Sequence, residues 1–220
     1  MMQRDLRRPL TYLITSGATS GETTVASVEF DALLSLVRSA VAAHVSLVQL
    51  REKNLSARML HDLAARASRL ACGSATRVVV NDRADIAHAA GCDGVQLTTR
   101  SLAAAVVRRA FGEDFLIGIS THSLAEARAA RDGGADFAVF GPVFDTPSKR
   151  AYGLPLGLEV LREAAHALSP FPLVAVGGID EENVREVLRA GAAGVAAIRL
   201  FANGQNLARQ VHHIESLRAA

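Results

Sequence analysis

The stretch that decides the fold is Ala135-Asp-Phe-Ala-Val-Phe-Gly-Pro-Val-Phe-Asp-Thr-Pro-Ser-Lys149. Its first part, up to Phe140, is an apolar run with the length and composition of a parallel strand that is covered on both faces. A Gly-Pro pair ends the run, and the loop beyond it carries Thr146, Ser148 and Lys149. Two hydroxyls and an ammonium past the carboxyl end of a parallel strand suit a phosphate or diphosphate. From these residues alone, an ordinary polar loop before a helix is an equally good interpretation.

Similar strand-like runs recur along the whole chain, and helical segments alternate with them. We expect strands at Thr11–Thr15, Ser46–Leu50, Arg77–Val80, Asp93–Leu97, Leu116–Ile119, Asp136–Phe140, Leu173–Val176 and Gly194–Ile198. We expect helices at Val28–Ala43, after an N-cap at Ser56, up to Ala90, from Ser101, after a capping box at Ser123 and Glu126, at Gly157–Leu168, from Asp180 and at Gln205–Leu217. This strict alternation predicts an α/β fold, a closed (βα)8 TIM barrel that residues 1–220 form as a single domain.

Three helix-to-strand turns resemble one another, at Ala90–Val95, Gly133–Ala138 and Ala190–Val195. In each of them a glycine can supply the left-handed residue that ends a helix, so we interpret the repeat as scaffold. The competing arrangement is an open doubly wound sheet. That fold favours a Gly-x-Gly-x-x-Gly turn after the first strand, and this chain has no such turn.

Composition limits the class of partner. The chain has 220 residues, is 50% hydrophobic, and carries a net charge of +2 from 24 basic and 22 acidic residues. Without a long block of like charge, this predicts a small-molecule partner and no nucleic acid. Cys72 and Cys92 have neither metal-ligand spacing nor a disulfide pattern, and no apolar segment approaches the ~20 residues that span a bilayer. The N-terminus has no signal-peptide pattern, so we expect a cytoplasmic protein with no membrane partner.

Polar side chains follow most of the expected strands at their carboxyl ends. They are Gln49, Arg51, Lys53, Asn81, Asp82, Gln96, Ser120, His122, Thr146, Ser148, Lys149 and Arg199. In a barrel these ends face a common pocket, so residues that the sequence scatters are expected to meet. Each residue alone has a simpler explanation, as a solvated cation, a turn residue or a helix cap. A cluster of cations, amides and one carboxylate at the functional end of the barrel favours a binding site.

A pair of glycines, Gly177 and Gly178, follows the seventh expected strand. Without Cβ atoms the backbone can approach a phosphate closely, and a helix beginning at Asp180 would offer free N–H groups. The loops after the last two strands commonly hold phosphate in this fold. Two glycines can also simply make the turn. Arg199 would either bind the same phosphate or close the barrel mouth.

Six motifs in this order resemble the thiamine phosphate synthase and TenI family of thiamine biosynthesis. They are Gln49-Leu-Arg-Glu-Lys53, Val80-Asn-Asp-Arg-Ala-Asp85, Gly94-Val-Gln-Leu97, Gly118-Ile-Ser-Thr-His-Ser123, Gly141-Pro-Val-Phe-Asp-Thr-Pro-Ser-Lys149 and Gly177-Gly-Ile179. The resemblance runs from Tyr12 to Phe201 and implies a barrel enzyme that handles a thiazole phosphate. The synthase branch joins a hydroxymethylpyrimidine diphosphate to the thiazole phosphate with loss of diphosphate, helped by Mg²⁺. The TenI branch includes thiazole tautomerases, which move a proton without a metal.

The resemblance also implies roles for the residues. Asp82 would be a metal ligand, and Ser120, His122 and Lys149 are the candidate catalytic residues. Substrate binding would fall to Gln49, Arg51, Lys53, Asn81, Gln96, Thr146, Ser148, Gly177, Gly178 and Arg199. Fixed cations and a metal suit a diphosphate leaving group, because they meet the negative charge that grows on it.

Two departures from the synthase pattern leave the reaction open. Gln96 stands where the synthase has a histidine. The stretch after it, which contains Arg100, replaces an acidic run that ends in a second metal-ligand aspartate. Ile198 and Arg199 replace a small hydroxyl residue near the thiazole phosphate. One carboxylate can still hold Mg²⁺ together with substrate phosphates and water. We favour the synthase, with Mg²⁺ as the cofactor, because Asp82 and Lys53 suit it and have no evident role in a metal-free tautomerase.

Two alternatives stand beside the synthase. The pattern from Gln96 to Ser101, and His122 as a proton-transfer group, favour a metal-independent tautomerase. The altered metal site would also suit a phosphometabolite-binding barrel without catalysis. We further expect Asp145–Pro155 to be a mobile lid, and a homodimer is the base-rate expectation for the assembly.

Overall fold

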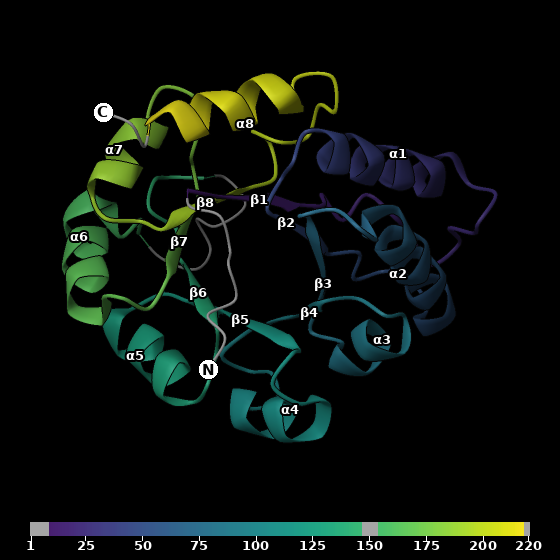
Figure 1. Ribbon diagram of the computed structural model, residues 1–220, viewed down its shortest axis with the longest axis horizontal. Helices are drawn as coiled ribbons and strands as arrows, with labels where there is room; N and C mark the ends of the chain where they lie inside the picture. Colours follow the sequence, from purple (N-terminus) through teal and green to yellow (C-terminus); the bar gives the residue numbers. More distant parts are fainter. Residues whose placement is uncertain (1–8, 147–153, 218–220) are drawn as a thin grey trace.

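The computed structural model describes residues 9–146 and 154–217, which include a closed barrel of parallel strands (Figure 1). Each strand pairs with the next in the chain, and the last pairs with the first. The strands are β1 (Leu10–Ile14), β2 (Leu47–Leu50), β3 (Arg77–Asn81), β4 (Gly94–Leu97), β5 (Leu116–Thr121), β6 (Phe137–Phe140), β7 (Leu173–Val176) and β8 (Gly194–Ala197). The predicted TIM barrel is confirmed, and each predicted strand ends within two residues of the observed one.

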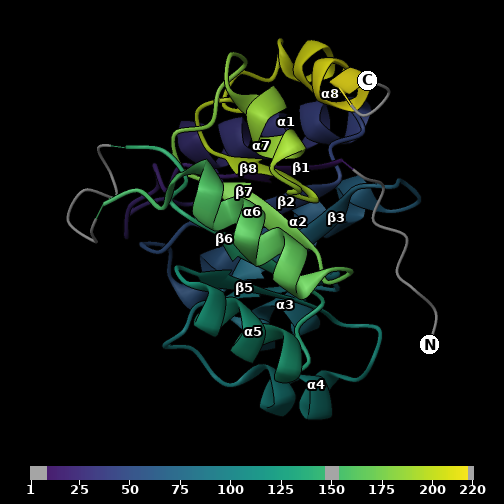
Figure 2. The same cartoon turned by 90° about the vertical axis from the view of Figure 1, so that its left-hand side faces the viewer.

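The helices form a ring outside the strands, and Figure 2 shows α6 lying across β6 and β7. They are α1 (Val28–Ala42), α2 (Ala57–Ala71), α3 (Ala84–Ala89), α4 (Ala104–Phe111), α5 (Leu124–Asp132), α6 (Gly157–Leu168), α7 (Val184–Arg189) and α8 (Leu207–Ser216). Each buries one apolar stripe against the barrel. In α2, for example, Leu60, Leu63, Ala64 and Ala67 recur at helical spacing and are buried.

Alternation along the strands divides the core into two clusters. One face of each strand packs outward against the helices, as Val48 and Leu50 of β2 do. The other face fills the barrel interior. The buried apolar residues of this interior cluster are Leu10, Tyr12, Ile14, Leu47, Val79, Leu116, Phe137, Val139, Val174 and Ala196. Polar side chains that lie two residues beyond interior positions are therefore aimed at the mouth of the barrel.

Of the four helix starts predicted at a serine or aspartate, two are correct and two are wrong. The hydroxyls of Ser56 and Ser123 cap α2 and α5 by accepting from the N–H groups of the residues three further along. The helix predicted from Ser101 begins at Ala104, because the Ser101 hydroxyl accepts the Thr98 N–H at 2.8 Å and closes a turn. Short hydroxyl side chains compete with helix formation in this way.

The second wrong start is the helix predicted from Asp180. The Asp180 carboxylate accepts the N–H groups of Glu182 and Asn183, each at 3.0 Å, and so holds a turn. Helix α7 begins only at Val184. Two of the N–H groups that a helix beginning at Asp180 would have offered to a phosphate are therefore already hydrogen-bonded to the Asp180 carboxylate.

The repeated helix-to-strand turns are scaffold, as predicted. Their glycines, Gly91, Gly134 and Gly191, have positive φ angles of 70°, 88° and 95°. Asp93 and Asp136, at equivalent places in two turns, each accept a backbone N–H of a neighbouring strand, at 2.8 Å from Val78 and 2.7 Å from Ile117. Each of these carboxylates therefore links two adjacent βα units by a hydrogen bond.

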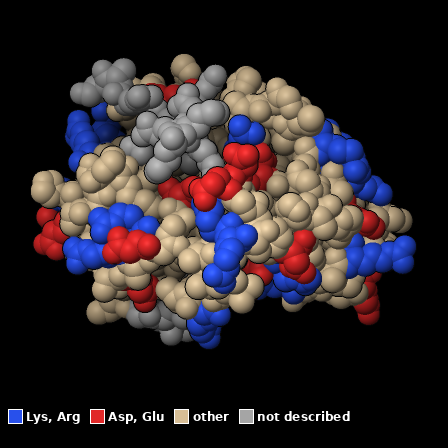
Figure 3. All heavy atoms as spheres, turned by 60° about the horizontal axis from the view of Figure 1, so that its bottom comes forward, with Lys and Arg blue, Asp and Glu red and all other residues tan. Residues whose placement is uncertain are grey.

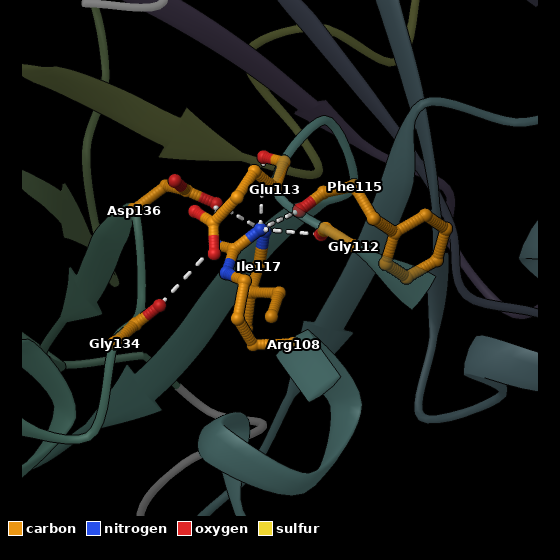
Figure 4. A network of polar contacts seen from close by, with 7 residues as sticks. All are labelled: Arg108, Gly112, Glu113, Phe115, Ile117, Gly134 and Asp136. Atoms are coloured by element: carbon orange, nitrogen blue, oxygen red, sulfur yellow. Dashed lines mark hydrogen bonds and ion pairs between the residues drawn. The ribbon is translucent and has the colours of Figure 1, made fainter. Parts of the chain in front are cut away.

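The Asp136 carboxylate also binds Arg108 of α4. Figure 4 shows the guanidinium pointing at that carboxylate, with an Nη to Oδ2 distance of 2.8 Å. The same guanidinium donates to the carbonyl oxygens of Gly112, Glu113, Phe115 and Gly134. The two side chains are only 14% and 23% exposed, so the pair fastens α4 to β5 and β6 in a partly buried setting.

On the face of the molecule that Figure 3 shows, the described residues form no large patch of one charge. Basic and acidic side chains are interspersed over the face that Figure 3 shows. Among the described residues, no helix combines the length and the apolar character that crossing a membrane requires.

Candidate functional site

Three of the predicted residues meet inside the barrel through a fourth that the sequence did not single out. The Gln49 amide donates from Nε2 to the hydroxyl of Tyr12 at 2.8 Å, and that hydroxyl donates to Oε1 of Gln96 at 2.9 Å. The Gln96 Nε2 then donates to the Ser120 Oγ at 3.1 Å. These four residues, here called the interior chain, come from β2, β1, β4 and β5. Their side chains form one polar layer beneath the barrel mouth.

Tyr12 is the member of this chain that sequence reasoning missed. It lies in a short apolar strand, where a tyrosine is expected to be a core residue, and it is fully buried. Its ring packs edge-on against Phe137, with 5.9 Å between ring centroids. Burial raises the pKa of Tyr12 far above its ordinary value, and the hydrogen bond from Gln49 only partly offsets this. The hydroxyl therefore keeps its proton.

Gly118 of β5 makes room for this layer. A Cβ atom there would lie 2.4 Å from Cζ of Phe137 and 2.5 Å from Oε1 of Gln96, far closer than van der Waals contact allows. The glycine in the Gly-Ile-Ser-Thr-His motif is thus explained by packing in the barrel. It lets the Gln96 side chain cross the interior.

At the exits of β1 and β2, a buried carboxylate holds the backbone. Glu52 is 2% exposed and accepts from the N–H of Gly17 at 3.1 Å, and from the N–H and hydroxyl of Thr19 at 3.3 and 2.7 Å. The N–H of its neighbour Arg51 donates to the hydroxyl of Thr15 at 2.8 Å. Nothing in the local sequence separates Glu52 from the cations on either side, so sequence reasoning missed it.

The two cations beside Glu52 differ in exposure. Arg51 is half-buried and lies two residues past the interior position Gln49, whereas Lys53 is exposed. Among the described residues, no ion pair is found for either side chain. Their charges are therefore free to meet an anion at the mouth, and their predicted role stays a prediction.

Asn81 and Asp82 end β3 beside β4. Asn81 lies opposite Gln96 in the strand register, and the Asp82 N–H donates to the Gln96 carbonyl oxygen at 2.9 Å. Asp82 has a φ of 59°, in the left-handed region that few residues with side chains adopt. The exposed Asp82 lines a small pocket with apolar side chains of β4, α4 and the loop between them, including Leu97, Phe111 and Leu102.

The donor set at Asp82 fits a metal ion only if a substrate completes it. Within residues 9–146 and 154–217, no group of three or more His, Cys, Asp or Glu side chains is arranged to hold a metal. The next strand exit instead carries the exposed Arg100. A single carboxylate together with a diphosphate and water is a common setting for Mg²⁺, so Asp82 suits an ion that arrives with its substrate.

His122, after β5, is exposed and oriented by the backbone. Its Nδ1 lies 2.5 Å from the carbonyl oxygen of Gly141, which fixes the proton on Nδ1 because a carbonyl can only accept. The backbone N–H of His122 donates to the Glu126 carboxylate at 2.7 Å. The Nε2 atom is left as the acceptor of the ring.

Gly177 and Gly178 have positive φ angles of 97° and 65°. The loop after β6 lies directly over them: the Phe144 N–H donates to the Gly177 carbonyl oxygen at 3.0 Å. A Cβ on Gly177 would lie 2.5 Å from Cβ of Pro142, and one on Gly178 would lie 2.6 Å from Cβ of Phe144. Both glycines are required for this contact between loops, besides any role at a phosphate.

The remaining predicted residues are not drawn into the interior chain. Arg199 is exposed and follows Ile198, which packs against the interior cluster. Thr146 is half-buried at the end of the described part of its loop. Ser148 and Lys149, like most of the predicted lid, lie outside the described residues.

Comparisons with known proteins agree on one family. The family model TMP-TENI, described as thiamine monophosphate synthase, matches residues 12–201. A candidate thiamine-phosphate synthase of Geobacter sulfurreducens is 49% identical over 166 residues, which cover 76% of this chain and 78% of that protein. The thiamine-phosphate synthase of Moorella thermoacetica is 38% identical, with 84% of this chain and 87% of that protein covered. The solved structure of the thiamine phosphate pyrophosphorylase from Pyrococcus furiosus superposes with a TM-score of 0.77 at 27% identity, and covers 99% of this chain and 97% of that one.

Proposed function

Since the chain belongs to the thiamine monophosphate synthase family, we propose that it joins a hydroxymethylpyrimidine diphosphate to a thiazole phosphate and releases diphosphate. The observation that carries the proposal is the meeting of Gln49, Gln96 and Ser120 beneath the barrel mouth, beside the backbone link from Gln96 to Asp82. Neutral amides and a hydroxyl suit the recognition of a polar heterocycle. Cations and a carboxylate at neighbouring exits suit its diphosphate.

The chemistry asks for charge stabilisation more than for covalent work. The bond between the pyrimidine methylene carbon and the diphosphate oxygen breaks, and the electron pair leaves with the diphosphate. The thiazole nitrogen then forms the new bond to that carbon. Arg51 and Lys53 would meet the charge that grows on the leaving diphosphate, which is the main way a site of this kind lowers the barrier. No side chain needs to act as a nucleophile.

Asp82 is the one carboxylate that was predicted to bind Mg²⁺. Asp82 would bind Mg²⁺ together with the diphosphate, and the ion would supply further neutralisation of the leaving group. The backbone at Asp82 is left-handed, with a φ of 59°. Arg51, Lys53 and the backbone around Gly177 would orient the remaining phosphate oxygens.

A coupled assay with both substrates and Mg²⁺ tests the proposal. Wild-type protein should form thiamine phosphate, and Asp82→Asn should lower kcat/KM by about a hundredfold, the effect expected for loss of a metal-bound transition-state contact of several kcal/mol. Asn keeps the left-handed backbone acceptable, so the change removes only the charge.

The matched control is Asp85→Asn. Asp85 is an exposed carboxylate three residues away that pairs with Arg83 at 2.6 Å, and its loss should leave the rate unchanged. No product from wild-type protein with both substrates, or equal rates for Asp82→Asn and wild type, would count against the proposed reaction.

His122 favours a second candidate, the metal-independent tautomerisation of a thiazole carboxylate phosphate. Its Nδ1 contact with Gly141 leaves Nε2 to take up and return a proton. This candidate predicts turnover that persists in the presence of a chelator and disappears in His122→Ala. Turnover that chelator abolishes would reject it and support the synthase.

A further inference from the structure

The interior chain has a fixed direction of hydrogen bonding. The two protons of the Gln96 Nε2 are both used, one toward the Ser120 Oγ at 3.1 Å and one toward the Leu97 carbonyl oxygen at 3.4 Å. The Gln96 Oε1 must therefore accept, and it accepts from the Tyr12 hydroxyl at 2.9 Å. Since that hydroxyl has spent its only proton, its oxygen accepts from Gln49.

The hydroxyl proton of Ser120 is not used within the interior chain. The Ser120 oxygen accepts from Gln96, so its own O–H has to donate elsewhere. Among residues 9–146 and 154–217, no hydrogen bond donated by this hydroxyl is found. Ser120 is half-buried at the carboxyl end of β5, on the interior face of the barrel. The proton therefore faces the mouth of the barrel, where a ligand would lie.

We propose that Tyr12 is a positioning residue that fixes the direction of the interior chain and thereby makes Ser120 a hydrogen-bond donor toward the substrate. The consequence for the site rests on the proposed function. The group it selects is an acceptor that thiamine phosphate retains, such as a ring nitrogen of the pyrimidine. Tyr12 touches no substrate itself, because it is fully buried below Gln49 and Gln96.

A tyrosine suits this task because its single hydroxyl can donate only once. With phenylalanine in its place, only the long contact of 3.4 Å with the Leu97 carbonyl oxygen would distinguish the nitrogen of the Gln96 amide from its oxygen. The amide could then turn over, accept the Ser120 proton on Oε1, and leave Ser120 with only lone pairs toward the mouth. Ser120 would lose its donor function although its side chain were unchanged.

The hydrogen bonds of the interior chain can be detected by NMR on the unliganded full-length protein. In wild type, the side-chain amide signals of Gln49 and Gln96 in ¹⁵N-resolved NMR spectra should show slow exchange with water. Ser120→Ala should shift the Gln96 signals and leave those of Gln49 in place, whereas Tyr12→Phe should shift both. Gln96 signals that ignore Ser120→Ala would overturn the proposal, and this variant keeps the measurement decisive even if Tyr12→Phe folds poorly.

The effect on the site can be measured by calorimetric titration with thiamine phosphate. Tyr12→Phe and Ser120→Ala should each weaken binding about tenfold, as for the loss of one neutral hydrogen bond. The double variant should be no weaker than either single variant, because both changes remove the same donor. Leu10→Val, a buried contraction on the same face of β1, is the control for lost stability and should bind like wild type.

The two hypotheses fail differently. Losses that multiply in the double variant, to about a hundredfold if each single loss is the expected tenfold, would overturn the role of Tyr12 while the synthase proposal stood. If the wild-type protein binds no thiamine phosphate, yet the variants show the expected NMR shifts, the synthase proposal is rejected and the hydrogen bonds of the interior chain are supported.

Discussion

The backbone N–H of Asp82 donates to the carbonyl oxygen of Gln96 at 2.9 Å, and Asp82 adopts a φ of 59° as it leaves β3. The link ties the carboxylate proposed for the metal to the strand that carries the amide of the interior chain. Aspartate and asparagine are among the few residues that tolerate this backbone. The position is therefore constrained by conformation as well as by chemistry.

This constraint predicts a stability pattern at Asp82. Asp82→Val should lower the free energy of unfolding by about 1 to 2 kcal/mol, because a β-branched residue is strained at positive φ. Asp82→Gly and Asp82→Asn should unfold at nearly the wild-type urea concentration. A valine variant as stable as wild type would show that the backbone at this position relaxes easily.

Glu52 should act as a clamp for the loop between β1 and α1. Glu52→Ala removes the acceptor for three donors of Gly17 and Thr19, and should cost about 2 to 4 kcal/mol of unfolding free energy. Glu52→Gln, which keeps one acceptor oxygen, should cost less. The exposed Glu22 provides the control, since Glu22→Ala should change stability by no more than about 0.5 kcal/mol. Urea unfolding measures all three, and equal effects of the two alanine variants would refute the clamp.

Gly118→Ala should disturb the interior chain by overpacking. The added methyl group meets Phe137 and Gln96 at 2.4 and 2.5 Å, and we expect a loss of about 1 to 3 kcal/mol in thermal or urea unfolding. Gly21→Ala is a suitable comparison, because a Cβ there meets nothing closer than 4.0 Å. If the two variants are equally stable, the interior is looser than its contacts imply.

The partly buried pair of Arg108 and Asp136 should contribute more to stability than an exposed pair. Arg108→Ala removes the guanidinium that donates to the Asp136 carboxylate and to several carbonyl oxygens, and should cost about 2 to 4 kcal/mol. Arg108→Lys should recover only part of this, because an ammonium cannot reproduce the fork of donors. Arg109→Ala, at the exposed neighbouring position, should be neutral in the same unfolding assay.

The two cysteines should differ sharply in reactivity. Burial, with a smaller contribution from Asp93, raises the pKa of the Cys92 thiol from 9.0 to about 12, whereas Cys72 is exposed. At about pH 8 an alkylating reagent should label Cys72 and leave Cys92 intact until the protein unfolds, because the thiolate is the reactive form. Mass spectrometry of the labelled protein reads this directly, and labelling of both at equal rates would contradict it.

The same pKa shift predicts alkaline destabilisation. In the unfolded chain Cys92 loses its proton above about pH 9, but in the folded protein it keeps the proton up to about pH 12. Stability is thus fully present below pH 9 and declines as the pH rises through this window. The raised pKa of Tyr12 acts in the same direction above its ordinary value of 10.0. Cys92→Ala should show a smaller decline than wild type in urea unfolding across that range.

The regular elements were predictable because they depend on short-range pattern. Apolar runs and helical spacing placed every strand and most helices, and the hydroxyls of Ser56 and Ser123 marked two helix starts. The errors at Ser101 and Asp180 have one cause. Both side chains bond to nearby N–H groups, and the same short polar residues that cap helices can instead hold a turn.

The sequence alone determined the barrel, the family resemblance and the set of polar residues at the strand exits, because each of these is written in local order and spacing. Tertiary structure decided which of them touch. Tyr12 and Gln96 are 84 residues apart in the chain, and no local pattern indicates that they share a hydrogen bond. In the sequence, Glu52 is a charged residue between two cations. In the fold, it is buried and accepts hydrogen bonds from Gly17 and Thr19. Hydrogen-bond partners of buried polar groups are set by closure of the barrel, since only closure removes the water that would otherwise satisfy them.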